Sequence, residues 1–157
     1  MIPFEAATLA NGLRVIVHRD VETPLVAVNV LYRVGSRDDP RHRTGLAHLF
    51  EHLMFGGSAH VPDFDEAIQL AGGENNAFTN ADATNYYDTL PAAHLEVALW
   101  LESDRMCCLK LDEEVLEVQR SVVIEEFKEA NYGEPWGDAW HHLLGLAWET
   151  HPYRWPT

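Results

Sequence analysis

Apolar and polar positions alternate along several short runs in the N-terminal half of the chain, a pattern typical of β-strands. The predicted strands cover residues 4–10, 13–18, 25–34, 75–79 and 84–90. Asn11-Gly12 separates the first two strands and predicts a tight hairpin, because both residues tolerate positive φ. The run 25–34 is rich in β-branched residues and predicts a buried strand. The polar residues 80–83 are expected to form the turn between the last two strands.

Between and after these strands, apolar residues recur at the spacing of an amphipathic helix. The predicted helices run from Thr44 to Gly56-Gly57 and over residues 63–71, 91–107, 113–130 and 135–148. Thr44, Asp63 and Asp112 are the expected N-caps, and Pro91 suits the first turn of a helix. Strands and helices do not follow a regular βαβ order. The sequence therefore predicts an α+β fold, with an antiparallel-rich sheet and helices packed on one face.

The charge and the apolar runs of the chain argue against two classes of partner. The 157 residues include 25 acidic and 11 basic residues, which give a formal net charge of −14. Because this negative potential repels phosphate groups, we expect no nucleic-acid partner. No apolar run approaches the roughly 20 residues of a membrane-spanning helix, so we expect no membrane partner either.

The cysteines and the last residues add two expectations. Cys107 and Cys108 are the only cysteines, and neighbours rarely bridge each other, so we expect no disulfide framework. Adjacent side chains diverge and are poor candidates to bind one metal ion, so we predict that both are core residues. Without a disulfide framework the protein is expected in the cytoplasm, or in the periplasm if a leader was removed. The chain stops at H-P-Y-R-W-P-T, which is unlike a loose polar tail. We therefore interpret residues 1–157 as a segment of a longer protein.

The strongest candidate for chemistry is His48-Leu49-Phe50-Glu51-His52. A helix advances about 100° per residue, so His48 and His52 lie about 40° apart on one face, with Glu51 beside them. Two imidazoles one turn apart can bind one metal ion, and the carboxylate can reach a water molecule there. The order H-x-x-E-H inverts the commoner zinc-protease motif H-E-x-x-H. Because the chain has nine histidines, a chance pair beside a glutamate is the alternative.

A catalytic zinc site needs a third protein ligand, and Glu126 is the candidate. By helical spacing this residue falls inside the apolar arc of the helix over 113–130. An inward carboxylate must be paired, protonated or bound to metal, because an isolated buried charge is costly. A buried ion pair with an arginine is the alternative, but the presence of His48 and His52 favours zinc. Gln119 lies on the same face and is a candidate to hydrogen-bond a metal ligand.

Three separated motifs carry a family resemblance. H-L-F-E-H, then G-G-E-N-N-A-F-T, then V-Q-R-S-V-V-I-E-E closely resemble the pitrilysin/insulinase family of zinc metallopeptidases. The smaller bacterial members and the mitochondrial processing peptidases are most similar, and the resemblance extends over essentially the whole chain. It implies that His48, His52 and Glu126 bind Zn²⁺ and that Glu51 is the general base. Many members have Glu at the position of Gln119, a departure that we expect to affect rate rather than metal binding.

The resemblance also implies where a substrate binds. The family pairs an extended peptide with the strand that corresponds to residues 75–79, a form of β-augmentation. Substrate binding is therefore assigned to Asn76, Ala77 and Phe78. A plain hairpin strand with a core phenylalanine is the alternative, and the residues by themselves favour it.

The resulting hypothesis is a zinc-dependent endopeptidase that hydrolyses peptides or unfolded polypeptide segments through a zinc-bound water activated by Glu51. The alternative is a noncatalytic structural or substrate-holding subunit of the same fold. Residues 1–157 are then the N-terminal part of the zinc-binding peptidase domain, without the later homologous domain, and we expect this piece to cleave poorly when isolated. The expected partners are a peptide substrate and a homologous second half or partner subunit. Uncovered edge strands would also allow a homo-oligomer.

Overall fold

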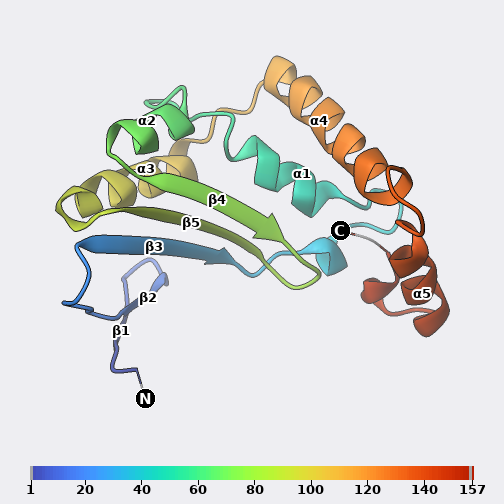
Figure 1. Cartoon of the computed structure of the whole chain (residues 1–157), viewed down its shortest axis with the longest axis horizontal. Coiled ribbons are helices and arrows are strands. Elements are labelled where there is room, and N and C mark those ends of the chain that lie inside the picture. Colours follow the sequence, from blue (N-terminus) through green and yellow to red (C-terminus); the bar gives the residue numbers. More distant parts are fainter. Residues whose placement is uncertain (1, 156) are drawn as a thin grey trace.

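A three-stranded antiparallel sheet and a separate hairpin make up the β-structure of the part of the chain that is described, residues 2–155 and 157 of a computed structural model. The strands are β1 (Glu5–Thr8), β2 (Arg14–Val17), β3 (Leu25–Tyr32), β4 (Glu74–Thr79) and β5 (Thr84–Pro91). β1 pairs with β2, and the main sheet has the order β3-β5-β4 (Figure 1). At the predicted hairpin, Gly12 has φ 89°, a conformation that glycine adopts without strain.

All but the last of the helices form two layers above this sheet, and the last lies beyond the end of the sheet (Figure 1). The helices are α1 (Leu46–Leu53), α2 (Phe64–Leu70), α3 (Leu95–Cys108), α4 (Glu113–Tyr132) and α5 (Ala139–Ala147). α1, α2 and α3 contact the sheet, whereas α4 lies against α1 as an outer layer (Figure 1). The predicted α+β fold, with an antiparallel sheet and helices on one face, is confirmed.

Alternate residues of each strand point toward the helices and form the core. Leu90 of β5 and Ala98 of α3 are buried together, and Val26 and Val28 of β3 pack against them. A neighbouring cluster joins α2 to α3 through buried apolar side chains: Val61, Phe64, Ile68 and Leu101. Residues of β3 with the opposite parity, such as Leu25 and Leu31, are exposed. The prediction that this strand is buried is therefore right for one face of the sheet and wrong for the other.

Three ionisable side chains lie together inside this core. Asp88 of β5 and both Glu102 and Arg105 of α3 are almost fully buried. The Arg105 guanidinium pairs with Glu102 and lies 4.1 Å from the centroid of the Phe64 ring, a cation–π geometry. Burial, reinforced by the charge of Glu102, raises the pKa of Asp88 to about 7. One arginine therefore faces two carboxyl groups, and a proton on Asp88 lowers the cost of burying them.

The predicted N-caps have different outcomes. Asp63 accepts a hydrogen bond from the Glu66 N–H at 2.9 Å, and Asp112 accepts one from the Val115 N–H at 2.8 Å. These two predictions are confirmed. Thr44 is not the cap of α1, because Gly45, with φ 91°, stands at that position.

The N-terminus of α1 is capped instead by the buried carboxylate of Asp39. Its Oδ2 accepts from the N–H groups of Gly45 at 2.7 Å and Leu46 at 3.1 Å, and its Oδ1 accepts from Ala47 at 3.0 Å. Three N–H groups without helical partners are thereby satisfied by one negative charge, which also interacts favourably with the helix dipole. A cap from several residues upstream depends on how the intervening loop folds, so local capping rules do not find it.

Two predicted helix starts differ from the structure. Pro91 ends β5 rather than beginning α3, and the Ala92 N–H donates to Pro24 O at 2.7 Å, which extends the strand pairing by one residue. α5 begins at Ala139 rather than near residue 135. Trp136 has φ 68°, a left-handed conformation that a helix cannot include.

The cysteines and the C-terminal residues also depart from expectation. Cys107 is exposed and Cys108 is half-buried at the end of α3, so the prediction that both are core residues is wrong. The C-terminal residues are held against earlier loops: Tyr153 Oη donates to Asp82 at 2.6 Å, and Trp155 Nε1 donates to Ser36 O at 2.7 Å. Within the described residues, no helix has both the length and the apolar character needed to cross a membrane.

Candidate metal centre

His48 and His52 project from one side of α1, one helical turn apart. Their Nε2 atoms lie 3.2 Å from each other. The helix places them there because residues four apart share a face. Asp39 fixes the first turn of this helix, so the orientation of His48 is tied to the loop before α1.

Glu126 of α4 completes a cluster with the two histidines. Its Oε2 lies 3.2 Å from His52 Nε2 and 3.6 Å from His48 Nε2. A ligand atom from each of the three side chains lies within 4.8 Å of the others. The Glu126 side chain is 46% exposed, so the prediction of an inward, buried carboxylate is wrong even though the residue faces α1. Its position follows from the packing of α4 on α1 and not from burial in the core.

The donor atoms of the cluster are spaced as zinc would require. In a tetrahedral zinc site with bonds of about 2.0–2.1 Å, neighbouring ligand atoms lie about 3.3 Å apart. The observed separations of 3.2, 3.2 and 3.6 Å match this spacing. Two imidazole nitrogens and a carboxylate oxygen are also the ligand types that suit zinc, and three protein ligands leave a coordination position open.

Glu51 lies on α1 between the two histidines and is buried. Thr79, at the end of β4, donates a hydrogen bond from Oγ1 to Glu51 Oε2 at 2.5 Å. The same hydroxyl lies 3.2 Å from the hydroxyl of Thr84 on β5, and Thr84 donates to Val34 O. A chain of threonine hydroxyls therefore connects Glu51 to the main sheet. Thr79 is a site residue that was not predicted from the sequence, although it is the last residue of the G-G-E-N-N-A-F-T motif.

β4 is an edge strand in the described part of the chain, where it pairs only with β5. Asn76 and Phe78 lie on the exposed face of the sheet, and Phe78 is 48% exposed. Ala77 lies on the face that carries Thr79 and the helices. Because Phe78 is exposed, the alternative of a core phenylalanine is wrong. The Ala77 N–H donates to Asn76 Oδ1 at 2.8 Å. This backbone N–H of β4 is therefore not used in the pairing with β5.

Gln119 lies on α4 two turns before Glu126 and is half-buried. Within the described residues, its side chain forms no hydrogen bond with His48, His52 or Glu126. The structure thus gives no contact through which Gln119 would orient a ligand.

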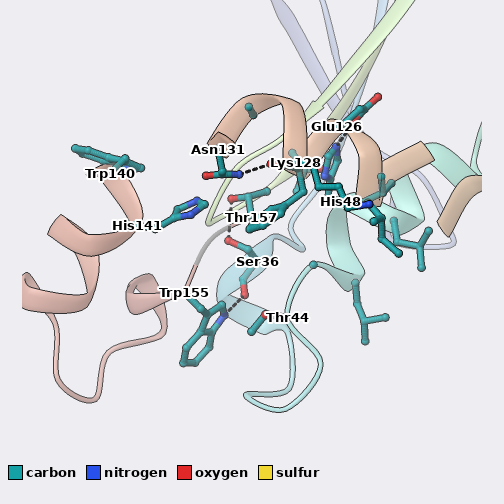
Figure 2. Close-up of a pocket in the computed structure, with 18 of the residues that line it drawn as sticks. Ser36, Thr44, His48, Glu126, Lys128, Asn131, Trp140, His141, Trp155 and Thr157 are labelled. Atoms are coloured by element: carbon teal, nitrogen blue, oxygen red, sulfur yellow. Dashed lines mark hydrogen bonds and ion pairs between the residues drawn. The ribbon is translucent and has the colours of Figure 1, made fainter. Parts of the chain in front are cut away.

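A large hollow opens beside the cluster. It has a volume of about 1080 Å³ and lies between α1, α4, α5 and the turn after β4. His48 and Glu126 line one end, and Trp140 and His141 of α5 line the other (Figure 2). Its volume is comparable to the upper end of the 300–1,000 Å³ that ligand sites of proteins commonly span.

Comparisons with known proteins identify the family of this chain. Residues 14–149 match the family described as Insulinase (Peptidase family M16). The zinc protease PqqE of Helicobacter pylori is 35% identical over 154 residues, which are 96% of this chain and 35% of that protein. The chain therefore spans about a third of the length of this relative.

Solved structures share the fold. The crystal structure of a protease from Helicobacter pylori matches with a TM-score of 0.93 and 34% identity, over 99% of this chain and 38% of that one. The crystal structure of pitrilysin matches with a TM-score of 0.84 and 26% identity, over 96% of this chain and 16% of that one. The sequence match, the similar structures and the His-His-Glu cluster agree, and the chain belongs to the insulinase family of peptidases, family M16.

Proposed function

We propose that this chain supplies the metal centre of a zinc-dependent endopeptidase that hydrolyses peptides or unfolded polypeptide segments. The observation that carries the proposal is the cluster of His48, His52 and Glu126, whose donor atoms have the spacing of zinc ligands. The family match and the zinc protease relative support the same chemistry. The alternative, a noncatalytic subunit, is disfavoured because this chain retains all four residues of the proposed site.

His48, His52 and Glu126 would hold the zinc ion. When bound there, the ion would lower the pKa of a water molecule and polarise the scissile carbonyl group. Glu51 would accept a proton from the attacking water and deliver it to the leaving amine. Thr79 holds one oxygen of Glu51 by a hydrogen bond, which leaves the other oxygen to take the proton.

The edge of β4 would bind the substrate through its backbone. An extended peptide that adds to this edge forms main-chain hydrogen bonds, which require no particular side chain. Because Asn76 and Phe78 point to the outer face of the sheet, we assign recognition to the backbone around Ala77, with Asn76 able to release the Ala77 N–H that it now binds. β4 ends at Thr79, so a peptide on this edge would lead to Glu51.

The rest of the protein is expected to complete the site. The chain spans about a third of its bacterial relative, so we interpret it as the N-terminal part of the peptidase domain. A homologous second half or a partner subunit would then enclose the substrate from the other side.

The test is Glu51→Gln in the full-length protein that contains this chain. We expect cleavage of an unfolded polypeptide to fall by about 10²–10⁴-fold, because a general base contributes about this factor. Zinc content should stay unchanged, because Glu51 is not among the proposed ligands. Equal cleavage by the variant and the wild type would show that Glu51 is not the base.

Glu126→Gln tests the third ligand, and its neighbour provides the control. Glu125 is 72% exposed and pairs with Lys128, so Glu125→Gln makes the same chemical change one residue away from the cluster. We expect Glu126→Gln to weaken zinc binding in a chelator competition and Glu125→Gln to leave it unchanged. Equal zinc affinities for both variants would remove Glu126 from the site.

A further inference from the structure

A buried carboxylate outside the metal centre joins the loop after α1 to the end of α3. We propose that this residue, Asp104, is a positioning residue that fixes the start of α4 and thereby the place of Glu126. The inference rests on the proposed function, because it takes Glu126 to be a zinc ligand.

Asp104 is the centre of a small cluster with Ser58 and His60. Ser58 Oγ donates to Asp104 Oδ2 at 2.5 Å, and His60 Nδ1 lies 2.7 Å from Asp104 Oδ1. Asp104 and Ser58 are 8% and 7% exposed, whereas the His60 side chain is 65% exposed. The hydrogen bonds from Ser58 and then from His60 hold the pKa of Asp104 below its ordinary value. The carboxylate is therefore charged at neutral pH, and both bonds are of the stronger, charge-assisted kind.

This cluster is not a nucleophilic site. Ser58 donates to the carboxylate and forms no hydrogen bond with His60 in the described structure, so no base is placed to activate the hydroxyl. Because Ser58 is buried, a substrate could not approach it. The arrangement is that of a structural tie between two segments.

Backbone pairing extends the tie beyond the three side chains. Ser58 and Leu109 form an isolated antiparallel bridge. The Ala59 N–H donates to Cys108 O at 2.8 Å, and the Lys110 N–H donates to Gly57 O at 3.0 Å. The segment after α1 is thus bound to the residues that lead from α3 into α4.

The first turn of α4 is held at the same place. Asp112, three residues after Leu109, caps α4. A Cβ added at Gly56 would lie 2.6 Å from Val115 Cγ1, which shows how closely the end of α1 approaches the first turn of α4. The C-terminal end of α1 and the N-terminal end of α4 therefore meet next to the Asp104 cluster.

A small movement at this point would displace Glu126. Eleven residues separate Val115 from Glu126, which is about 17 Å along a helix at 1.5 Å per residue. A rotation of about 5° about the first turn would therefore move Glu126 by about 1.5 Å. A zinc site tolerates only about 0.2 Å in its ligand distances. α4 packs on α1 but several of its apolar side chains are exposed, so burial in the core contributes little to holding this helix: Leu116, Val118, Val122, Ile124 and Phe127.

The experiment compares Asp104→Asn and Ser58→Ala with wild type in the full-length protein. Zinc affinity is measured by chelator competition, and the d–d absorption of the Co²⁺-substituted protein reports the ligand geometry. We expect both variants to bind zinc about tenfold more weakly, in line with the effect of residues that orient metal ligands. The Co²⁺ spectrum should change although every ligand is still present.

Ile68→Val is the matched control for a general loss of stability. Ile68 is buried in the core between α2 and α3, and losing one methyl group lowers stability without touching the cluster. We expect this variant to melt at a lower temperature with unchanged zinc affinity and an unchanged Co²⁺ spectrum. If Ile68→Val weakens zinc binding as much as Asp104→Asn, or if Asp104→Asn leaves it unchanged, the proposal is overturned.

Hydrogen exchange separates this proposal from the metal site on which it rests. If the wild-type protein binds no zinc, the proposed function fails, but the anchoring of α4 is still measurable. Faster exchange of the amides of residues 113–126 in Asp104→Asn, and not in Ile68→Val, would support the anchoring. Unchanged exchange there would overturn it.

Discussion

The sheet with α2 and α3 is packed around fully buried side chains, whereas α4 and α5 leave many of their apolar residues exposed. Ile68, Leu90 and Leu101 are each 1% exposed. On the outer helices, Val118 is 54% and Leu146 84% exposed. The proposed metal site lies at the boundary, because two of its ligands come from α1 on the packed sheet and the third comes from α4.

The residues that stabilise the fold and the residues of the proposed metal site therefore lie in different parts of the molecule. The packed region itself contains none of the proposed ligands. It supports α1, which carries His48 and His52, and thereby determines the orientation of that helix. α4 contributes Glu126 but little burial, so its position depends on α1 and on the tie at Asp104. We therefore expect core substitutions to change the free energy of unfolding, and substitutions on the exposed face of α4 to change it very little.

The largest expected effect on stability comes from Leu101→Ala. Leu101 is buried between α2 and α3, and removing its side chain leaves a cavity that costs about 2–5 kcal/mol in the free energy of unfolding. Urea denaturation measures this change. Leu99→Ala is the control, because Leu99 is on the same helix but 51% exposed, and its loss should cost less than about 1 kcal/mol. Similar losses for the two variants would contradict the division into packed and open regions.

A smaller, pH-dependent effect is expected from Asp88→Asn. Burial raises the pKa of Asp88 to about 7, far above its unfolded value, so the folded state holds a proton that the unfolded state releases. The stability due to this proton is complete below the unfolded pKa and is lost as pH rises through about 7. Asparagine carries no charge, so the variant should gain stability relative to wild type between pH 5 and pH 8.

Urea denaturation at pH 5, 6.5 and 8 measures this relative gain. Glu5→Gln serves as the control, because Glu5 lies on the exposed strand β1. Its difference from wild type should not vary with pH in this range. If the difference between Asp88→Asn and wild type is also constant across the three pH values, Asp88 does not hold the proton.

The smallest effect is expected from Val118→Ala on α4. Val118 is more than half exposed, and alanine favours a helix more than valine does, so the free energy of unfolding should stay within about 0.5 kcal/mol of wild type. Val97→Ala is the matched substitution on α3, where Val97 packs against both core clusters. We expect Val97→Ala to be clearly more destabilising in the same urea titration. A larger cost for Val118→Ala would mean that α4 is covered by packing that this chain does not include.

Local sequence signals predicted most elements and some of their caps. Asp63 and Asp112 could be assigned as caps because a capping side chain acts on N–H groups two or three residues away. Thr44 failed because the capping carboxylate, Asp39, reaches α1 across a loop. Pro91 failed because the strand pairing between β3 and β5 continues past the point at which the residue type would favour a helix.

In the candidate site, too, contacts between residues close in the chain could be predicted and contacts between distant elements could not. The helix repeat alone places His48, Glu51 and His52 together, and the spacing of the motif is sufficient to predict this. The exposure of Glu126 and the hydrogen bond from Thr79 to Glu51 could not be predicted, because each depends on how α4 and β4 pack against α1. The predicted role of Gln119 stays a prediction without a contact to support it.

By itself, the sequence determined the elements, the pair of imidazoles on one helix and the charge of the surface, because each follows from residues close together in the chain. The tertiary structure alone decided that Glu126 of α4 meets the two histidines, that Asp39 caps α1 and that Asp104 of α3 binds the loop after α1. These contacts join residues that are far apart in the chain. Their geometry is set by the packing of helices on the sheet, which no local periodicity encodes.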